Sequence, residues 1–338
     1  MTSMSAAIQA ISYYLPPGEL TNEELHARFP EWSVEKIARK TGIMSRRIAA
    51  PEVCSSDLGV ESARRLFEHH SVDPSTVDFL LFCTQSPDYF LPTTACLMQE
   101  RLGIPTTAGA LDFNLGCSGF VYGLSLARGL IESGDARNVL LITAETYSKF
   151  IHPKDKSVRT IFGDGAAAAL IGPANDGAAL GPFVFGTDGA GAPNLIVPTG
   201  GMRKPRTDAP VETADQDGNA RDGDSLFMDG GEVFNFTLHR IPKLVEDVLK
   251  KAHLTADDVD LFVFHQANHY VLEALRKKMK LPAEKVYEFM SNCGNTVSAT
   301  IPIALSEAFA SGRVAHGTRV MLVGFGVGYS WAGCIARL

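Results

Sequence analysis

The sequence has 338 residues and lacks any long apolar run, because its apolar stretches are strand-length and are interrupted by Gly, Asp or Asn. A membrane helix needs about 18 to 20 apolar residues in a row, so we predict no transmembrane segment and no membrane partner. The N-terminal stretch MTSMSAAIQAISYYLPPGEL also lacks a basic segment and a clear secretory cleavage site. We therefore expect a cytoplasmic protein.

Signs of metal or nucleic-acid binding are lacking as well. The 6 cysteines form no C-x-x-C pair and accompany no histidine-rich cluster, which argues against a zinc site and against a disulfide framework. A net charge of −7 argues against general nucleic-acid binding. Most of the cysteines are expected to be buried, reduced and inert, so that an exceptional one would be catalytic.

An internal duplication organises what is present. Residues 71–146 and 254–328 both predict strand, helix, strand, turn, helix and strand, in the same order. Continuous apolar strands such as DFLLF and LFVF are typical of a sheet covered on both faces, and alternation with helices indicates parallel pairing. The sequence thus predicts an α/β fold of two similar halves, residues 1–175 and 176–338.

The duplication matches residues of chemical interest. An offset of 182 (265 − 83) pairs Cys83 with His265, and an offset of 178 (295 − 117) pairs Cys117 with Asn295. Cys117 and Asn295 both lie where a strand leads into a helix, and His265 ends a strand. Ligands of open α/β sheets gather at such carboxyl ends of strands. A pseudo-twofold arrangement of the halves would bring the three side chains together.

Cys117 is the candidate nucleophile. It lies in DFNLGCSGFVYGL, and the helix that starts after it offers free N–H groups and the positive end of a dipole, which lower the pKa of a thiol. Each residue also has a structural interpretation: Cys117 as a small buried side chain, His265 as a core group, and Asn295 as a left-handed turn residue beside Gly294. Their matched positions favour the functional interpretation.

Five motifs extend this picture over nearly the whole chain: ARKTGIMSRRIA, FGDGAAAALI, HQAN, GNTVSATIP and GFGVGYSWAGCIARL. With these motifs the sequence resembles the ketoacyl-acyl-carrier-protein synthase III group of the thiolase superfamily. The resemblance implies a five-layered αβαβα fold, a homodimer and a catalytic triad of Cys117, His265 and Asn295. Thiolases place a second Cys at the position of Asn295 and elongating condensing enzymes a second His, so the Asn disfavours both.

The resemblance implies an acyltransferase reaction in two steps. Cys117 attacks an acyl-CoA and keeps the acyl group. Malonyl-acyl carrier protein then loses CO₂ while His265 and Asn295 donate hydrogen bonds to the enolate oxygen, and condensation gives a 3-ketoacyl thioester for fatty acid or related acyl biosynthesis. The backbone N–H groups of Cys117 and Gly326 would form the oxyanion hole. Acyl-CoA is a substrate, and no metal or organic cofactor is required.

The expected contacts to CoA depart from the family pattern. They fall on Lys36, Lys40, Lys156 and Asn268. Relatives that start fatty acids carry Trp and Arg where this chain has Lys36 and Lys40. Lysine pairs with phosphate but does not stack on adenine. Trp32 lies too early in the sequence to match, although a longer preceding helix would let it reach the nucleotide.

The expected acyl pocket comprises Phe90, Leu91 and Met228. Leu91 replaces an aromatic residue of acetyl-preferring relatives, a residue that reaches into the partner subunit's pocket. This replacement predicts room for a primer longer than acetyl. The polar segment 200–224 is either a solvated loop or a lid at the tunnel mouth.

A basic run after HQAN, with Arg276, Lys277 and Lys278, is expected to dock the acidic carrier protein. The same run also suits a plain solvated helix face. An Arg usual in the family is Tyr270 here, so a CoA-bound acceptor stays open as an alternative to the carrier protein.

Other functions stay open beside the synthase III reaction. A specialised relative would make quinolone signals, prime a polyketide or form an ester. A non-catalytic partner subunit is disfavoured because Cys117, His265 and Asn295 are all retained. A cysteine hydrolase would need neither the duplication nor GNTVSATIP. The sequence does not name the primer, the acceptor or the pathway.

Overall fold

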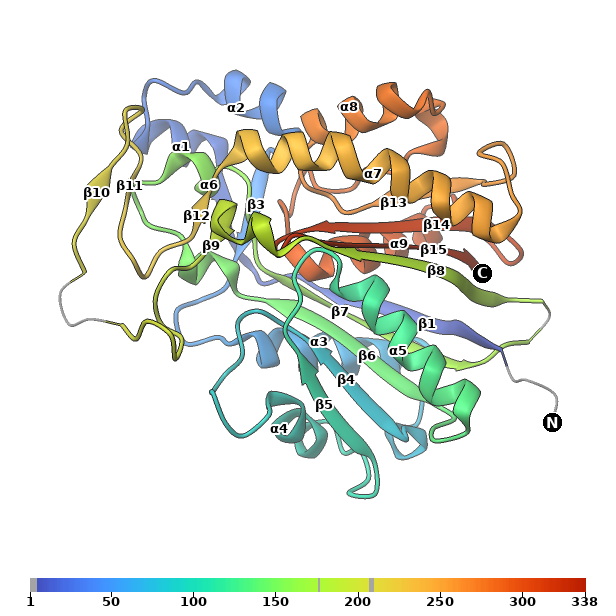
Figure 1. The fold of residues 1–338 in the computed structure, drawn as a ribbon. Coiled ribbons are helices and arrows are strands. Elements are labelled where there is room, and N and C mark those ends of the chain that lie inside the picture. The colour runs from blue at the N-terminus through green and yellow to red at the C-terminus, as the bar shows by residue number, and fades with distance from the viewer. Residues whose placement is uncertain (1–4, 176, 207–209) are drawn as a thin grey trace.

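The computed structural model describes residues 5–175, 177–206 and 210–338, and two large β-sheets form its framework (Figure 1). The first sheet has the order β1 (Ala6–Tyr14), β7 (Gly165–Pro173), β6 (Val139–Glu145), β4 (Phe79–Cys83) and β5 (Gly109–Phe113). The second has the order β8 (Ala179–Thr187), β15 (Ser330–Arg337), β14 (Arg319–Gly326) and β13 (Leu261–Phe264). The first four strands of the two sheets follow the same order, so the sequence duplication is also a structural one.

The counterpart of β5 is not a strand. The duplication matches YEFM, residues 287–290, with the first half's β5 and so predicts a strand there, but the second half forms an isolated bridge between Phe262 and Val286 instead. The side chain of Gln266 takes up the backbone groups that a strand would have paired. Its Nε2 donates to the carbonyl of Tyr287 at 3.2 Å, and its Oε1 accepts from the N–H of Phe289 at 2.7 Å.

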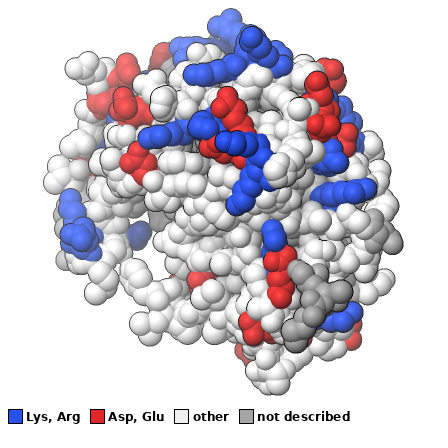
Figure 2. Space-filling model, turned by 45° about the vertical axis from the view of Figure 1, so that its right-hand side comes forward, with Lys and Arg blue, Asp and Glu red and all other residues white. Residues whose placement is uncertain are grey.

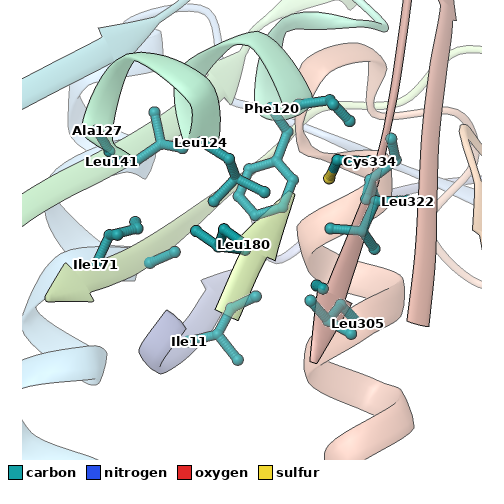
Figure 3. Packing of buried hydrophobic residues seen from close by; sticks show 14 of the residues in the cluster. Ile11, Phe120, Leu124, Ala127, Leu141, Ile171, Leu180, Leu305, Leu322 and Cys334 are labelled. Carbon is teal, nitrogen blue, oxygen red and sulfur yellow. The ribbon is translucent and has the colours of Figure 1, made fainter. Parts of the chain in front are cut away.

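Helices complete five layers around the two sheets (Figure 1). Helices α3 (Ser55–His69) and α4 (Thr94–Arg101) cover the outer face of the first sheet, and α7 (Gly230–Ala252) and α8 (His269–Met279) cover that of the second. Between the sheets lie α5 (Gly119–Ser133) and α9 (Thr300–Ala310), whose apolar residues form the central core (Figure 3). The predicted five-layered αβαβα fold is therefore confirmed.

Strand β6, with the sequence VLLITAE, has apolar side chains on both faces of the sheet. Leu141 points into the central core beside Leu124 of α5, whereas Leu140 and Ile142 point into the outer core beneath α3. Successive side chains of a strand face opposite sides of the sheet, and both sides are covered here. All seven residues of β6 are buried, and this includes its last residue, Glu145.

The smaller elements lie mostly at the periphery. They are β2 (Gly18–Thr21), α1 (Asn22–Arg28), α2 (Val34–Thr41), β3 (Ser45–Ile48), α6 (Lys156–Arg159), β9 (Leu195–Ile196), β10 (Thr213–Ala214), β11 (Ala220–Arg221) and β12 (Phe227–Met228), with the 3₁₀ turns η1 (Pro74–Thr76), η2 (Tyr147–Phe150), η3 (Gly189–Asn194), η4 (Ala283–Lys285) and η5 (Val297–Ala299). Strands β10 and β11 pair as a hairpin within the polar segment 200–224. Across the described part of the chain, no helix is long and apolar enough to span a bilayer.

Candidate active site

A cavity of about 350 Å³ is lined by residues of α7, α8 and β14 and by the segments that follow β13 and α6. Its wall brings together Cys117, His265, Asn295, Gly326 and Met228, which are separated widely in the sequence. A volume of this size is typical of sites for small molecules or for part of a larger ligand. The cavity therefore collects side chains that the sequence analysis had placed at separate strand ends.

Cys117 lies two residues before α5, where the backbone is pressed closely against β14. A Cβ atom added at Gly324 would lie 2.8 Å from the carbonyl oxygen of Cys117, and one added at Gly326 would lie 2.8 Å from its Sγ. The hydroxyl groups of Ser118 and Ser330 are 2.6 Å apart and link this turn to the start of β15. The glycines of β14 thus allow one half to support the nucleophile turn of the other.

Burial opposes the ionisation of Cys117. Its side chain is 5% exposed, and burial raises the pKa of the thiol to about 12, while a hydrogen bond from the backbone of Val327 acts in the opposite direction. A helix dipole contributes up to about 1 kcal/mol, which is less than one pKa unit. Our expectation of a lowered thiol pKa is therefore wrong for the empty site, because desolvation outweighs the dipole of α5.

His265 follows β13 and is held from below by Thr300. Its Nδ1 lies 2.7 Å from Oγ1 of Thr300, which also lies 2.9 Å from the carbonyl of Val297. The imidazole packs edge-on against the ring of Phe325, with 5.6 Å between centroids. Burial lowers the pKa of His265 to about 3, so the ring is neutral around pH 7.

The amide of Asn295 has a defined orientation. Its Oδ1 accepts from the N–H of Val297 at 2.9 Å, so its Nδ2 is directed toward Nε2 of His265 at 3.4 Å and the carbonyl of Ala267 at 3.4 Å. Its backbone N–H donates to the carbonyl of Ile161 at 2.9 Å. The segment around Ile161 that carries the FGDG motif therefore supports the Asn295 turn.

The turn after Asn295 contains backbone strain. Val297 has φ of 55°, although a β-branched residue is very unfavourable in the left-handed region, and Gly294 has φ of 76°. The left-handed positions are thus Gly294 and Val297, not Asn295 as the structural interpretation of the sequence supposed. The strain at Val297 directs its N–H back to the side chain of Asn295.

Comparison with known proteins identifies the family. The family model described as 3-Oxoacyl-[acyl-carrier-protein (ACP)] synthase III matches residues 111–189, and its C-terminal counterpart matches residues 249–338. A protein of Caldanaerobacter subterraneus subsp. tengcongensis named beta-ketoacyl-[acyl-carrier-protein] synthase III is 39% identical over 99% of this chain and 98% of its own length. The chain belongs to the synthase III family.

Further relatives agree with this assignment. A Clostridioides difficile protein with the same name is 36% identical over 98% of both chains. A crystal structure entitled 3-oxoacyl-(acyl-carrier-protein) synthase III is 55% identical, with a TM-score of 0.97 over 99% of this chain and 100% of that chain. The synthase III family consists of condensing acyltransferases with the thiolase fold, and the observed layers match that fold.

Among the residues predicted to bind CoA, the lysines already have partners within the chain. The Nζ atoms of Lys36 and Lys40 lie 5.0 and 5.3 Å from the ring centroid of Trp32, on which they stack as cations. Lys156 is mostly buried and donates to Oε1 of Glu31 at 2.6 Å. A CoA phosphate at this synthase III site would have to compete with Glu31 for Lys156.

The other predicted CoA and acyl contacts divide into two groups. Asn268 and Met228 line the cavity, and the Asn268 side chain also caps α8 by accepting from the N–H of Val271. Phe90 and Leu91, in contrast, do not line it, and each is 82% exposed on the loop between β4 and α4. Within one chain, therefore, only Met228 of the predicted acyl pocket lies at the site.

The predicted docking residues lie on the last turn of α8. Arg276 makes a bidentate contact with Glu273 at 2.7 and 2.8 Å, and Lys277 lies 3.1 Å from the same carboxylate. Lys278 is exposed. Figure 2 shows Lys and Arg gathered along the upper edge of the molecule, which carries α2, α7 and α8 in Figure 1, with acidic side chains among them. Part of the predicted positive charge is thus neutralised within α8.

Sequence reasoning missed two residues that support the site, Thr300 and Glu145. Thr300 stands in the GNTVSATIP motif, and its i+5 position after Asn295 gave no sign of a contact with His265. Glu145 ends an otherwise apolar strand, and a carboxylate at the end of such a strand was the available signal. It is fully buried, and its pKa is raised to about 8 chiefly by burial.

Proposed function

We propose that the chain transfers an acyl group from acyl-CoA to Cys117 and condenses it with malonyl-acyl carrier protein, with release of CO₂, to give a 3-ketoacyl thioester. The observation that carries this proposal is the shared wall of one cavity, where Cys117, His265 and Asn295 meet in a member of the synthase III family. The condensation chemistry assigns a separate task to each of the three residues.

In the first step Cys117 is the nucleophile. Its Sγ attacks the thioester carbonyl, the bond to the CoA sulfur breaks, and the thiol proton ends on the departing CoA thiol, so the exchange needs no net proton. The backbone N–H groups of Cys117 and Gly326 are proposed to hold the developing oxyanion. The absence of a side chain at Gly326 leaves its backbone in contact with the sulfur.

In the second step His265 and Asn295 stabilise the enolate that forms when the malonyl group loses CO₂. The Asn295 amide offers Nδ2–H because its oxygen is bonded to Val297. In the free site the Thr300 hydroxyl donates to the carbonyl of Val297 and therefore accepts from Nδ1–H of His265. For His265 to donate from Nε2 to the enolate, the hydroxyl must turn and donate to Nδ1, which moves the proton of the neutral ring to Nε2. The carbanion then attacks the acyl carbon, and Cys117 leaves as a thiolate that takes up one proton.

The finer assignments form part of the same proposal. CoA contacts are assigned to Lys36, Lys40, Lys156 and Asn268, and carrier docking to Arg276, Lys277 and Lys278. The enzyme is proposed to act in the cytoplasm as a homodimer without a bound cofactor. Phe90 and Leu91 of one subunit would then reach the acyl pocket of the other and, with Met228, admit a primer longer than acetyl. Their exposure in the single chain supports this role.

Intact-protein mass spectrometry tests the first step. The wild type and Cys117→Ala are exposed to a panel of acyl-CoAs of increasing chain length. We expect one acyl group on the wild type and none on the variant, with the best primer longer than acetyl. Acylation by acetyl-CoA alone would refute the primer assignment, and thioester turnover by Cys117→Ala would refute the catalytic role.

The second step is tested by adding malonyl-CoA or malonyl-acyl carrier protein to the acylated enzyme. We expect loss of the acyl mass and a 3-ketoacyl product on the carrier protein. A different product would point to the specialised acyl transfers. A faster reaction with malonyl-CoA would identify malonyl-CoA, rather than malonyl-acyl carrier protein, as the acceptor substrate.

A further inference from the structure

Glu145 occupies a position in the first half that corresponds to Gly326 in the second. Glu145 ends β6 and pairs with Gly165, the first residue of β7, whereas Gly326 ends β14 and pairs with Ser330, the first residue of β15. Both strands occupy the same place in their sheets. The two residues are therefore topologically equivalent, although Gly326 has no side chain and Glu145 carries a carboxylate.

Each of these strand ends lies against a turn from the opposite half. Gly326 contacts Cys117, and Glu145 contacts Ser298, three residues after Asn295. Because Cys117 and Asn295 are themselves matched by the duplication, the two contacts are related by the same pseudo-symmetry. The carboxylate of Glu145 thus contacts the turn that carries Asn295. At the equivalent position in the second half, the residue that contacts the Cys117 turn is a glycine.

The carboxylate joins segments from both halves. Its Oε1 accepts from the hydroxyl of Ser298 at 2.8 Å, and its Oε2 accepts from the N–H of Gln85 at 3.0 Å and from the hydroxyl of Ser86 at 3.1 Å. All of these partners donate, which suits a carboxylate rather than an amide. Glu145 forms no ion pair within the described residues, so its charge is compensated by neutral donors alone.

Gln85 links the carboxylate of Glu145 to the Cys117 turn, because its N–H donates to Glu145 and its side chain packs against Gly116. Burial is the main reason for the raised pKa of the thiol, and the negative charge of Glu145 adds to the increase. The other titratable groups around the pair are Cys83 of β4, Tyr147 of η2 and His265; the pKa values of Cys83 and Tyr147 are raised and that of His265 is lowered. The pKa of Glu145 is itself raised to about 8, so its carboxyl is ionised just above pH 8, where these three groups are still neutral and do not offset its charge.

We propose that Glu145 is a positioning residue for the Asn295 turn and that its buried carboxylate disfavours a second negative charge on the sulfur of Cys117. The positioning role rests on the proposed function, because it is expressed in the decarboxylation step. The electrostatic role does not, because it is a property of the free thiol. The two roles are therefore tested by separate measurements.

The electrostatic role is tested by the pH dependence of Cys117 alkylation with iodoacetamide, followed on the Cys117 peptide by mass spectrometry. In Glu145→Gln the charge that is present above about pH 8 is lost, so we expect the profile to move down by about one pH unit, which is about tenfold more thiolate at a given pH in that range. Ser298→Ala keeps the charge and is expected to leave the profile in place. A Glu145→Gln profile equal to that of the wild type would overturn this role.

The positioning role is tested by measuring the two half-reactions separately. Both Glu145→Gln and Ser298→Ala are expected to slow malonyl decarboxylation about tenfold while acylation of Cys117 is not slowed. Equal slowing of both half-reactions would show that Glu145 has only a general structural role and would overturn the positioning role. Asp112→Asn serves as a matched control, because Asp112 is a partly buried carboxylate of the same sheet, bonded to the N–H groups of Thr94 and Ala95.

The outcomes distinguish this inference from the proposed function. Asp112→Asn is expected to lose thermal stability without moving the alkylation profile or the ratio of the half-reactions. A wild type that neither becomes acylated nor releases CO₂ would refute the proposed function and the positioning role. The alkylation profiles would still decide the electrostatic role.

Discussion

At the scale of single residues, the site depends on where a side chain is missing as much as on where one is present. Gly326 touches Cys117, and a Cβ atom there would lie 2.8 Å from its Sγ and 3.0 Å from its Cβ. Overpacking of this kind costs about 1 to 3 kcal/mol in a core, and here it falls on the nucleophile itself. The contact makes position 326 sensitive to the smallest possible substitution.

We therefore expect Gly326→Ala to fold and to lose most of its acylation, because the added methyl group displaces Sγ and the backbone donor. Acylation is measured by intact mass and folding by thermal unfolding. Gly129→Ala is the control, since Gly129 lies on α5 with no atom near the added Cβ. Normal acylation of Gly326→Ala would show that the close contact is not needed.

Thr300 provides a second prediction at this scale. Thr300→Val keeps the shape but removes the hydroxyl next to Nδ1 of His265. We expect decarboxylation to fall about tenfold, less than the roughly 100-fold cost of removing a direct oxyanion donor, while acylation is kept. Thr296→Val is the control, because the Thr296 hydroxyl is buried and has no hydrogen-bond partner among the described residues. A Thr300→Val enzyme with normal decarboxylation would exclude the role of the hydroxyl.

The sequence indicated Cys117, His265 and Asn295 because their strand ends recur in a duplicated pattern. It did not indicate Thr300 or the left-handed backbone of Val297, because both depend on how the Asn295 turn packs against neighbouring segments. The pKa of Cys117 was mispredicted for a related reason: a local helix start is visible in the sequence, but the degree of burial is not.

At the scale of elements, most of both sheets could be predicted. Strands such as β6 are apolar on both faces and are flanked by turn residues, so they are identifiable without knowledge of their neighbours. The strand expected at residues 287–290 is the instructive failure. Gln266 occupies its backbone groups by a tertiary contact, which no pattern of apolar residues reveals.

The segment between helices α1 and α2 affects one of the proposed CoA contacts, Lys156. The residue between them, Glu31, pairs with Lys156 at 2.6 Å, and the backbone carbonyl of Asp217 accepts from the same ammonium at 2.7 Å. This pairing lowers the pKa of Glu31, so its carboxylate is charged at neutral pH. The proposed phosphate ligand Lys156 is therefore already neutralised in the free enzyme.

We expect Glu31→Gln to lower the KM for acyl-CoA about two- to fivefold, because the exposed ion pair is weak and its loss frees Lys156 for a phosphate. The kcat of the reaction should be unchanged, because Glu31 is remote from the cavity residues. Steady-state kinetics over a range of acyl-CoA concentrations measures both constants. The control is Glu35→Gln, which removes a carboxylate of α2 that has no ion pair with Lys156. A higher KM in Glu31→Gln would mean that Glu31 instead orients Lys156 for CoA.

At the scale of the whole molecule, one edge of the first sheet is unprotected. Within the described ranges of the chain, strand β5 pairs only with β4, and Leu111 at its centre is 45% exposed. The nearby loop between β4 and α4 exposes Tyr89, Phe90 and Leu91. An unpaired strand edge with exposed apolar side chains is a template for pairing with another chain. These features support the proposed homodimer and place its contact next to the loop that carries Leu91.

The dimer is tested by Leu111→Lys, because a charged side chain on an edge strand blocks pairing between chains. We expect the wild type to sediment as a dimer and the variant to shift toward monomer. Met44→Lys places the same charge at a position of similar exposure, 48%, away from β5, and should remain dimeric. If Leu91 completes the partner's acyl pocket, the Leu111→Lys monomer should also lose its preference among primers of different length. A monomeric wild type with full chain-length selectivity would show instead that the pocket is complete within one chain.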